Sequence, residues 1–174
     1  IKAFEIDYRS GNLDFDEYCS FLLHPLIGMN VDDLDELVSE FIESHKEKLI
    51  DPMTFDLLKR HKDDFRLVAS GSLDFIVKGF TNYFELDAYL GSSYEVVDNK
   101  ISGKLTKAAF AQGKLEKVRE WCQKNGYIVE ESFFYTDSIN DLPLIKVCPR
   151  SIIISPDKKL EDYALANNIE VLTR

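Results

Sequence analysis

Residues 133–144 read Phe-Phe-Tyr-Thr-Asp-Ser-Ile-Asn-Asp-Leu-Pro-Leu, an apolar run followed at once by a polar, acidic segment. The apolar run predicts a short buried strand. Asp137 and Asp141 follow it four residues apart, with Ser138 and Asn140 between them. In open α/β sheets, ligands bind at the carboxyl ends of the strands. A hard cation such as Mg²⁺ is held by one or two carboxylates together with water and substrate oxygens. This segment therefore predicts an α/β fold with polar chemistry where a strand ends.

The rest of residues 63–174 continues this pattern, because short apolar runs alternate with helical stretches. Such alternation is typical of a parallel sheet that helices cover on both faces. The pair Asp98-Asn99 predicts a hairpin turn. Strands are expected near 65–69, 88–91, 94–97, 101–105, 132–135, 151–154 and 170–172, with helices near 75–80, 113–125, 141–146 and 160–166.

Residues 1–62 contain helical patterns and no convincing strand. Apolar residues recur at steps of three and four between Leu34 and Ile42, which predicts an amphipathic helix. Asn30 precedes this helix as a cap, and Pro52 favours the first turn of another. Further helices are expected over 1–9 and 13–23. We therefore expect a helical domain over residues 1–62 and an α/β domain over residues 63–174.

Composition excludes several classes of protein. The 174 residues carry 31 acidic and 21 basic side chains, a net charge of −10, which argues against binding to nucleic acid or to an anionic membrane. No stretch approaches the roughly 18 consecutive apolar residues of a membrane helix. The three cysteines (Cys19, Cys122 and Cys148) are odd in number and far apart, so they indicate neither a disulfide framework nor a zinc site. A cytoplasmic location is expected.

Two other segments carry polar groups at predicted strand ends or helix starts. Ser70-Gly71-Ser72 offers hydroxyls and a glycine that lets backbone N–H groups approach an anion. Gly113-Lys114 places an ammonium at a helix start. Each segment also has an ordinary structural interpretation. Ser70-Gly71-Ser72 is then a helix cap, and Lys114 is a lysine exposed to solvent. Together, a hydroxyl, a lysine and carboxylate-bound Mg²⁺ are suited to handling a phosphoryl group.

The order of these segments resembles the haloacid dehalogenase superfamily of phosphohydrolases, and more closely the branch that contains phosphoserine phosphatase. Residues 67–72 are similar to the second motif of the family, 112–115 to the third and 135–144 to the fourth, which is the most specific. Residues 155–160 and the hairpin around 98–105 also resemble parts of this branch. The resemblance implies a Rossmann-like core with a helical cap domain, and residues 1–62 fit that cap.

The resemblance also implies a role for each matched residue. Ser70, with Gly71 and Ser72, would bind the transferring phosphoryl group, and Lys114 would bind phosphate and offset its negative charge. Asp137 would ligate Mg²⁺. Asp141, with Ser138 and Asn140, would lie behind the metal and orient water molecules and the lysine.

The first motif of the family, a strand that ends in Asp-x-Asp, has no convincing match in the sequence. Phe4-Glu5-Ile6-Asp7 is only faintly similar, and it runs directly into a helical segment. The family's nucleophile and its general acid/base belong to this motif, which lies on the central strand of the sheet. Because the chain begins at Ile1, we expect that an N-terminal segment of about 40 residues precedes it, by the family's layout. The chain alone is then expected to be inactive.

The sequence thus predicts a Mg²⁺-dependent phosphatase that acts through an aspartyl-phosphate on a small phosphorylated metabolite. A non-catalytic relative that binds a phospho-ligand or a protein partner is the alternative. A receiver or dinucleotide-binding domain is a third class, but neither an N-terminal acidic cluster nor a Gly-x-Gly-x-x-Gly segment after a strand is visible. The sequence does not name the substrate.

Overall fold

The computed structural model of the chain describes Phe4, Asp7 and residues 13–174. Apart from Phe4 and Asp7, the helix expected over residues 1–9 lies outside the described residues. The chain forms two units, each built from two separate stretches of sequence. The first unit comprises residues 1–46 and 65–109, and the second comprises residues 47–64 and 110–174.

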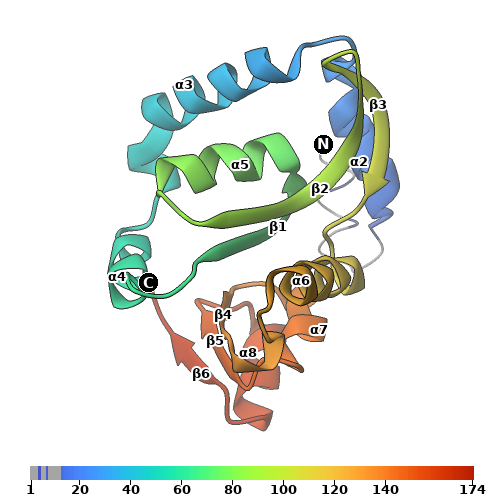
Figure 1. The fold of residues 1–174 in the computed structure, drawn as a ribbon. Helices are drawn as coiled ribbons and strands as arrows, with labels where there is room; N and C mark the ends of the chain where they lie inside the picture. The colour runs from blue at the N-terminus through green and yellow to red at the C-terminus, as the bar shows by residue number, and fades with distance from the viewer. Residues whose placement is uncertain (1–3, 5–6, 8–12) are drawn as a thin grey trace. The chain divides into compact units, whose positions relative to one another are not determined.

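Helices and strands alternate through the second half of the chain, as the sequence predicts (Figure 1). The α-helices are α2 (Phe15–Leu23), α3 (Val31–Leu49), α4 (Pro52–Arg60), α5 (Asp74–Tyr83), α6 (Gln112–Asn125), α7 (Leu142–Ile145) and α8 (Lys158–Ala166). The strands are β1 (Leu67–Leu73), β2 (Ala88–Val97), β3 (Lys100–Lys107), β4 (Phe133–Thr136), β5 (Arg150–Ile154) and β6 (Glu170–Leu172). Single 3-10 turns cover η1 (His24–Leu26), η2 (Val129–Glu131) and η3 (Ile139–Asp141).

The first unit contains a three-stranded sheet in the order β1-β2-β3. Strands β1 and β2 are parallel and are connected by α5, whereas β2 and β3 form an antiparallel hairpin. Asp98 and Asn99 both have positive φ, at 50° and 60°, the backbone form that a tight two-residue hairpin turn requires. The predicted hairpin is therefore confirmed, although β2 is one continuous strand where two were expected.

Strand β1 differs from the expectation at residues 70–72. These residues were expected as a turn after a strand over 65–69, but β1 continues to Leu73. Ala69 pairs with Leu90 and Leu73 pairs with Ser92, so three residues of β1 lie opposite the single residue Gly91. Extra residues on one strand make a bulge, which bends the strand and redirects its side chains. Ser70, Gly71 and Ser72 thus form a bulge within β1 directly before α5.

Gly91 packs against this bulge so closely that no side chain fits there. A Cβ atom at Gly91 would lie 2.8 Å from both the Ser72 carbonyl oxygen and the Asp74 Cα. We expect Gly91→Ala to lower the free energy of unfolding by about 1 to 3 kcal/mol, because rigid backbone atoms would have to move. Urea unfolding measures the loss. Val97→Ala, at an exposed position on the same strand, is the control, and an equally small effect of both changes would contradict the close packing.

The core of the first unit lies between helices and the sheet. Leu34, Val38 and Ile42 of α3 are buried, and they pack with Phe75 of α5 and Ile101 of β3. Leu37 and Phe41, which belong to the same predicted apolar stripe, are about half exposed. Helices α3 and α5 lie side by side (Figure 1). Asn30 precedes α3, and its expected role as the helix cap stays a prediction. The amphipathic pattern therefore predicts the helix correctly, but only part of its apolar stripe is buried.

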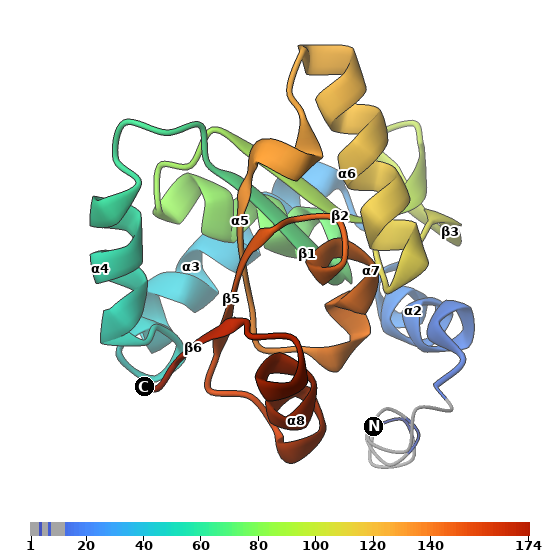
Figure 2. The ribbon, with the colours of Figure 1, turned by 90° about the horizontal axis from the view of Figure 1, so that it is seen from below.

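The second unit contains a parallel sheet in the order β4-β5-β6, with α6, α7 and α8 gathered around it (Figure 2). Its core centres on Ile153 and Leu160, which are fully buried. Within the described residues, β4 pairs only with β5 and β1 only with β2, so each is the edge strand of its own sheet. The sequence analysis expects a central strand of the sheet to be missing from this chain, and this stays a prediction.

Residues 47–64 belong to the second unit through specific contacts. Asp51 caps α4, and its side chain accepts a hydrogen bond from the Met53 N–H. At the other end of α4, the His61 ring nitrogens lie 2.7 Å from the Asp64 carboxylate and 2.7 Å from the Tyr135 hydroxyl. Helix α4 is thereby tied to β4. The expected assignment of residues 1–62 as one cap domain and 63–174 as the core stays a prediction.

All three cysteines are free and buried. Burial disfavours the charged thiolate, and it raises the pKa of Cys19 and of Cys148 to about 11. Burial also raises the pKa of Cys122. These thiols therefore behave as core groups. None of the helices within residues 13–174 combines the length and hydropathy needed to cross a lipid bilayer.

Candidate active site

Lys114 and Asp141 form a buried ion pair in the second unit. The Lys114 Nζ lies 2.5 Å from Asp141 Oδ1, and the two side chains are only 10% and 7% exposed. The Thr136 hydroxyl donates a hydrogen bond to Asp141 Oδ2 at 2.7 Å and accepts one from the Ser138 N–H. Each carboxylate oxygen of Asp141 thus has a partner, which a buried charge requires. A lysine ammonium has three donors, and Asp141 accounts for one of them.

Local backbone structure positions both members of this pair. Lys114 lies in the first turn of α6, and Ala111 just before the helix has a φ of +46°, which is unusual for a residue with a side chain. Asp141 ends the turn η3, which Ser138 caps by accepting a hydrogen bond from the Asn140 N–H. The ammonium and the carboxylate therefore meet at the carboxyl end of β4, where the sequence predicts polar chemistry.

Asp137 follows β4 directly and is half exposed. Its Oδ2 lies 3.2 Å from Arg174 Nη2, and Arg174 Nε lies 3.3 Å from Asp51 Oδ2. A solvent-facing carboxylate at a strand end is a hard oxygen donor, and Mg²⁺ in proteins is usually held by one or two carboxylates plus waters and substrate oxygens. The chemistry of Asp137 therefore fits Mg²⁺. Within the described part of the chain, no group of three or more His, Cys, Asp or Glu side chains is placed to hold a metal ion.

The bulge of Ser70, Gly71 and Ser72 lies in the first unit, and hydrogen bonds hold its backbone in place. The Ser72 N–H donates to Ser70 Oγ at 3.2 Å. Ser92, which is fully buried, donates from its hydroxyl to the Gly71 carbonyl at 2.8 Å and accepts from the Ala109 N–H at 3.0 Å. These bonds fix the backbone of the bulge. Such a bulge directly before a helix can present backbone N–H groups to an anion.

The structure thus brings together some of the predicted residues. Lys114 and Asp141 are in contact, and Asp137 and Ser138 lie at the same strand end. Ser70, Gly71 and Ser72 belong to the first unit, so their convergence with Lys114 and Asp137 stays a prediction. Sequence reasoning missed the groups that hold the predicted ones in place: Thr136, Ser92, Asp51 and Arg174.

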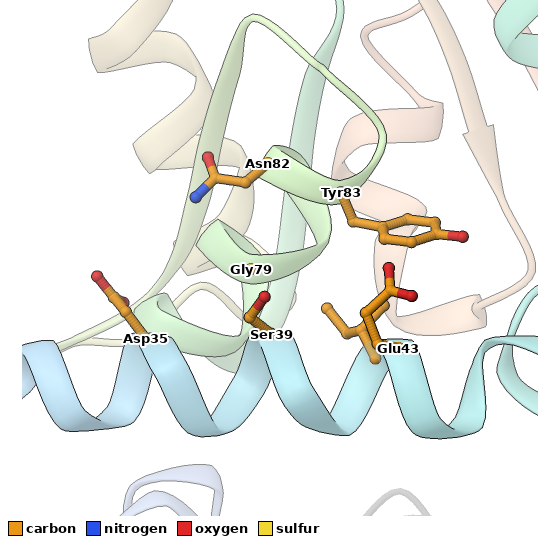
Figure 3. A pocket seen from close by; sticks show the side chains of 7 residues that line it. Asp35, Ser39, Glu43, Gly79, Asn82 and Tyr83 are labelled. Carbon is orange, nitrogen blue, oxygen red and sulfur yellow. The ribbon is translucent and has the colours of Figure 1, made fainter.

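A pocket of about 260 Å³ lies elsewhere in the first unit, between α3 and α5 (Figure 3). Asp35, Ser39 and Glu43 project toward it from α3, and Asn82 and Tyr83 line it from the last turn of α5. The bulge at residues 70–72 precedes the opposite end of α5. Because its lining carries carboxylates, this pocket does not suit a phosphate group.

The chain is similar in sequence to known proteins. The chain is 29% identical over 178 residues to a histidinol-phosphatase of Neisseria meningitidis, covering 98% of this chain and 80% of the relative. It is 26% identical over 160 residues to a probable phosphatase of Mycobacterium tuberculosis, of which it spans only 56%. Both relatives are described as phosphatases.

Solved structures share the fold. A protein of unknown function from Bordetella pertussis superposes with a TM-score of 0.88 at 22% identity, over 98% of this chain and 79% of that one. A probable phosphoserine phosphatase from Vibrio cholerae superposes with a TM-score of 0.68 at 17% identity, with half of its length covered. The model of the haloacid dehalogenase-like hydrolase family matches residues 3–146, most of the chain. The chain therefore belongs to the haloacid dehalogenase-like hydrolase family.

Proposed function

We propose that this protein is a Mg²⁺-dependent phosphomonoesterase that acts through an aspartyl-phosphate on a small phosphorylated metabolite. The buried pair of Lys114 and Asp141 at the end of β4 is the observation that carries the proposal. Burying an ammonium costs free energy, because the charged group loses its hydration. Such a cost is expected in a site where the ammonium also binds an anionic substrate. Membership of a hydrolase family supports the same conclusion. A cytoplasmic location is part of the proposal.

Each residue has a definite task in this proposal. Lys114, oriented by Asp141 and Thr136, holds a phosphate oxygen and offsets its charge. Ser70, with the N–H groups of the bulge, binds the other oxygens of the phosphoryl group. Asp137 holds the metal, which supplies charge neutralisation between the nucleophile and the phosphate. The nucleophile in this proposal is the aspartate of the family's first motif.

The substrate proposal follows the histidinol-phosphatase of Neisseria meningitidis, of which the chain covers 80%. Histidinol phosphate is the first substrate to test, because the Neisseria histidinol-phosphatase aligns over 98% of this chain. Phosphoserine is the second, because phosphoserine phosphatases share the fold. Both are phosphate esters of small amino alcohols, so both fit the proposed class of substrate.

The decisive experiment measures phosphate release by the full-length protein from histidinol phosphate, phosphoserine and an aryl phosphate, with and without Mg²⁺. We expect turnover that requires Mg²⁺, and none from residues 1–174 alone. Activity of the full-length protein in excess EDTA would contradict the proposed metal dependence. Phosphate binding without turnover would instead favour the non-catalytic alternative.

Ser70→Ala tests the predicted phosphate contact of the bulge. Loss of one hydrogen bond to a charged phosphoryl group is expected to lower kcat/KM about tenfold. Ser102→Ala removes a hydroxyl from β3 of the same unit, outside the predicted site, and is expected to leave kcat/KM unchanged. Equal rates for Ser70→Ala and the wild type would remove Ser70 from the proposed site.

A further inference from the structure

Arg174 is anchored at three points in the second unit. Its N–H donates to Ser155 Oγ at 2.8 Å, its Nε lies 3.3 Å from Asp51 Oδ2, and its Nη2 lies 3.2 Å from Asp137 Oδ2. Ser155 follows β5, Asp51 precedes α4 and Asp137 follows β4. The guanidinium therefore links the proposed metal ligand to two other segments of the same unit.

Two of these anchors are fixed independently of Arg174. Asp51 uses its other oxygen, Oδ1, to cap α4 through the Met53 N–H at 2.8 Å, so its carboxylate has a set orientation. Ser155 has a φ of +43°, a left-handed conformation that is uncommon for serine, and its N–H donates to the Leu172 carbonyl at 2.8 Å. Unfavourable backbone conformations of this kind persist where the surrounding structure holds them, and they cluster at functional sites.

The geometry points to Arg174 as a resident counter-cation of Asp137, which competes with Mg²⁺ for this carboxylate and so sets the affinity for the metal. This inference rests on the proposed function, in which Asp137 holds Mg²⁺. With Arg174 in place, the two carboxylates of Asp51 and Asp137 carry an excess of one negative charge. Without it, the excess is two, which attracts a divalent cation more strongly.

The sign of the effect distinguishes this role from simple positioning. If Arg174 only oriented the Asp137 carboxylate for the metal, its removal would weaken Mg²⁺ binding. If it competes, its removal strengthens binding. The side chains of Arg174 and Asp137 are 46% and 56% exposed, so solvent screens their attraction and the expected change is modest, about threefold.

The test is a calorimetric titration of the full-length protein with MgCl₂. Arg174→Gln is expected to lower the Kd for Mg²⁺ about threefold at low ionic strength. Arg174→Lys keeps the positive charge and is the matched control, with a Kd close to that of the wild type. Because salt screens exposed charges, the difference between Arg174→Gln and the wild type is expected to shrink at 1 M NaCl.

Asp137→Asn separates failure of this inference from failure of the proposed function. If Asp137→Asn binds Mg²⁺ as the wild type does, the proposed metal site is wrong. If Asp137→Asn loses Mg²⁺ while Arg174→Gln binds it equally or more weakly, the site stands and the competing role of Arg174 is overturned. A tighter Kd in both Arg174→Gln and Arg174→Lys would also overturn it, because charge would not be the cause.

Discussion

Lys114→Ala is expected to lower the free energy of unfolding by about 3 to 5 kcal/mol, because it leaves the Asp141 carboxylate buried without its partner. The Thr136 hydroxyl would remain on Asp141 but cannot neutralise its charge. Urea unfolding followed by the fluorescence of Trp121, which lies on the same helix as Lys114, measures the loss. Phosphatase activity is expected to fall with it, since Lys114 also contacts the substrate in the proposed function.

Lys124→Ala is the matched control for this change. Lys124 lies in the last turn of α6 and is exposed, so its loss is expected to change stability by less than about 0.5 kcal/mol. A double substitution of Lys114 and Asp141 by alanine should cost less than the two single changes together, because each single change leaves an unpaired buried charge and the double change leaves none. Additive losses would show that the two side chains do not act as a pair.

Asp137→Asn is expected to lower Mg²⁺-dependent phosphate release by the full-length protein at least about 100-fold, because a metal that neutralises charge contributes several kcal/mol. The substitution keeps the size of the side chain and removes only its charge. Asp137 is half exposed, so the free energy of unfolding is expected to change by less than about 1 kcal/mol. Steady-state kinetics with urea unfolding of the same sample separates the two effects.

Asp157→Asn provides the same chemical change after another strand of the same sheet. Asp157 caps α8 by accepting the Leu160 N–H, and asparagine is an equally good cap. Its activity and stability are expected to match the wild type. If Asp137→Asn were as active as Asp157→Asn, the metal would have to be held elsewhere.

Much of the fold follows from local patterns. The apolar runs of β4 and β5, the left-handed Gly126 that ends α6 and the turn at Asp98-Asn99 are each set by a few neighbouring residues. The bulge at residues 70–72 is different. The bulge requires a glycine at position 91, because a larger side chain there would collide with its backbone. Nothing in the sequence around residues 70–72 indicates this contact with another strand.

The candidate site likewise contains some contacts that the sequence predicts and others that it does not. Lys114 and Asp141 are 27 residues apart, and their contact was expected because the resemblance to the family implies that Asp141 orients the lysine. Thr136 follows the strand expected over 132–135, and nothing in the sequence shows that its hydroxyl donates to Asp141. The link from Arg174 to Asp51 joins distant segments through partly exposed side chains, which hydropathy patterns do not reveal.

Each unit is assembled from stretches that are not contiguous in the chain. Residues 47–64 belong with residues 110–174, although residues 65–109 of the first unit are synthesised between them. During translation, helix α4 therefore emerges well before the β4 strand that carries Tyr135, its partner for His61. The first unit can fold before β4, the partner strand of α4, has been synthesised. We therefore expect α4 to pack onto the second unit in a slow, late step of folding on the ribosome. No single cut in the gene separates the two units, because any such cut leaves part of one unit attached to the other.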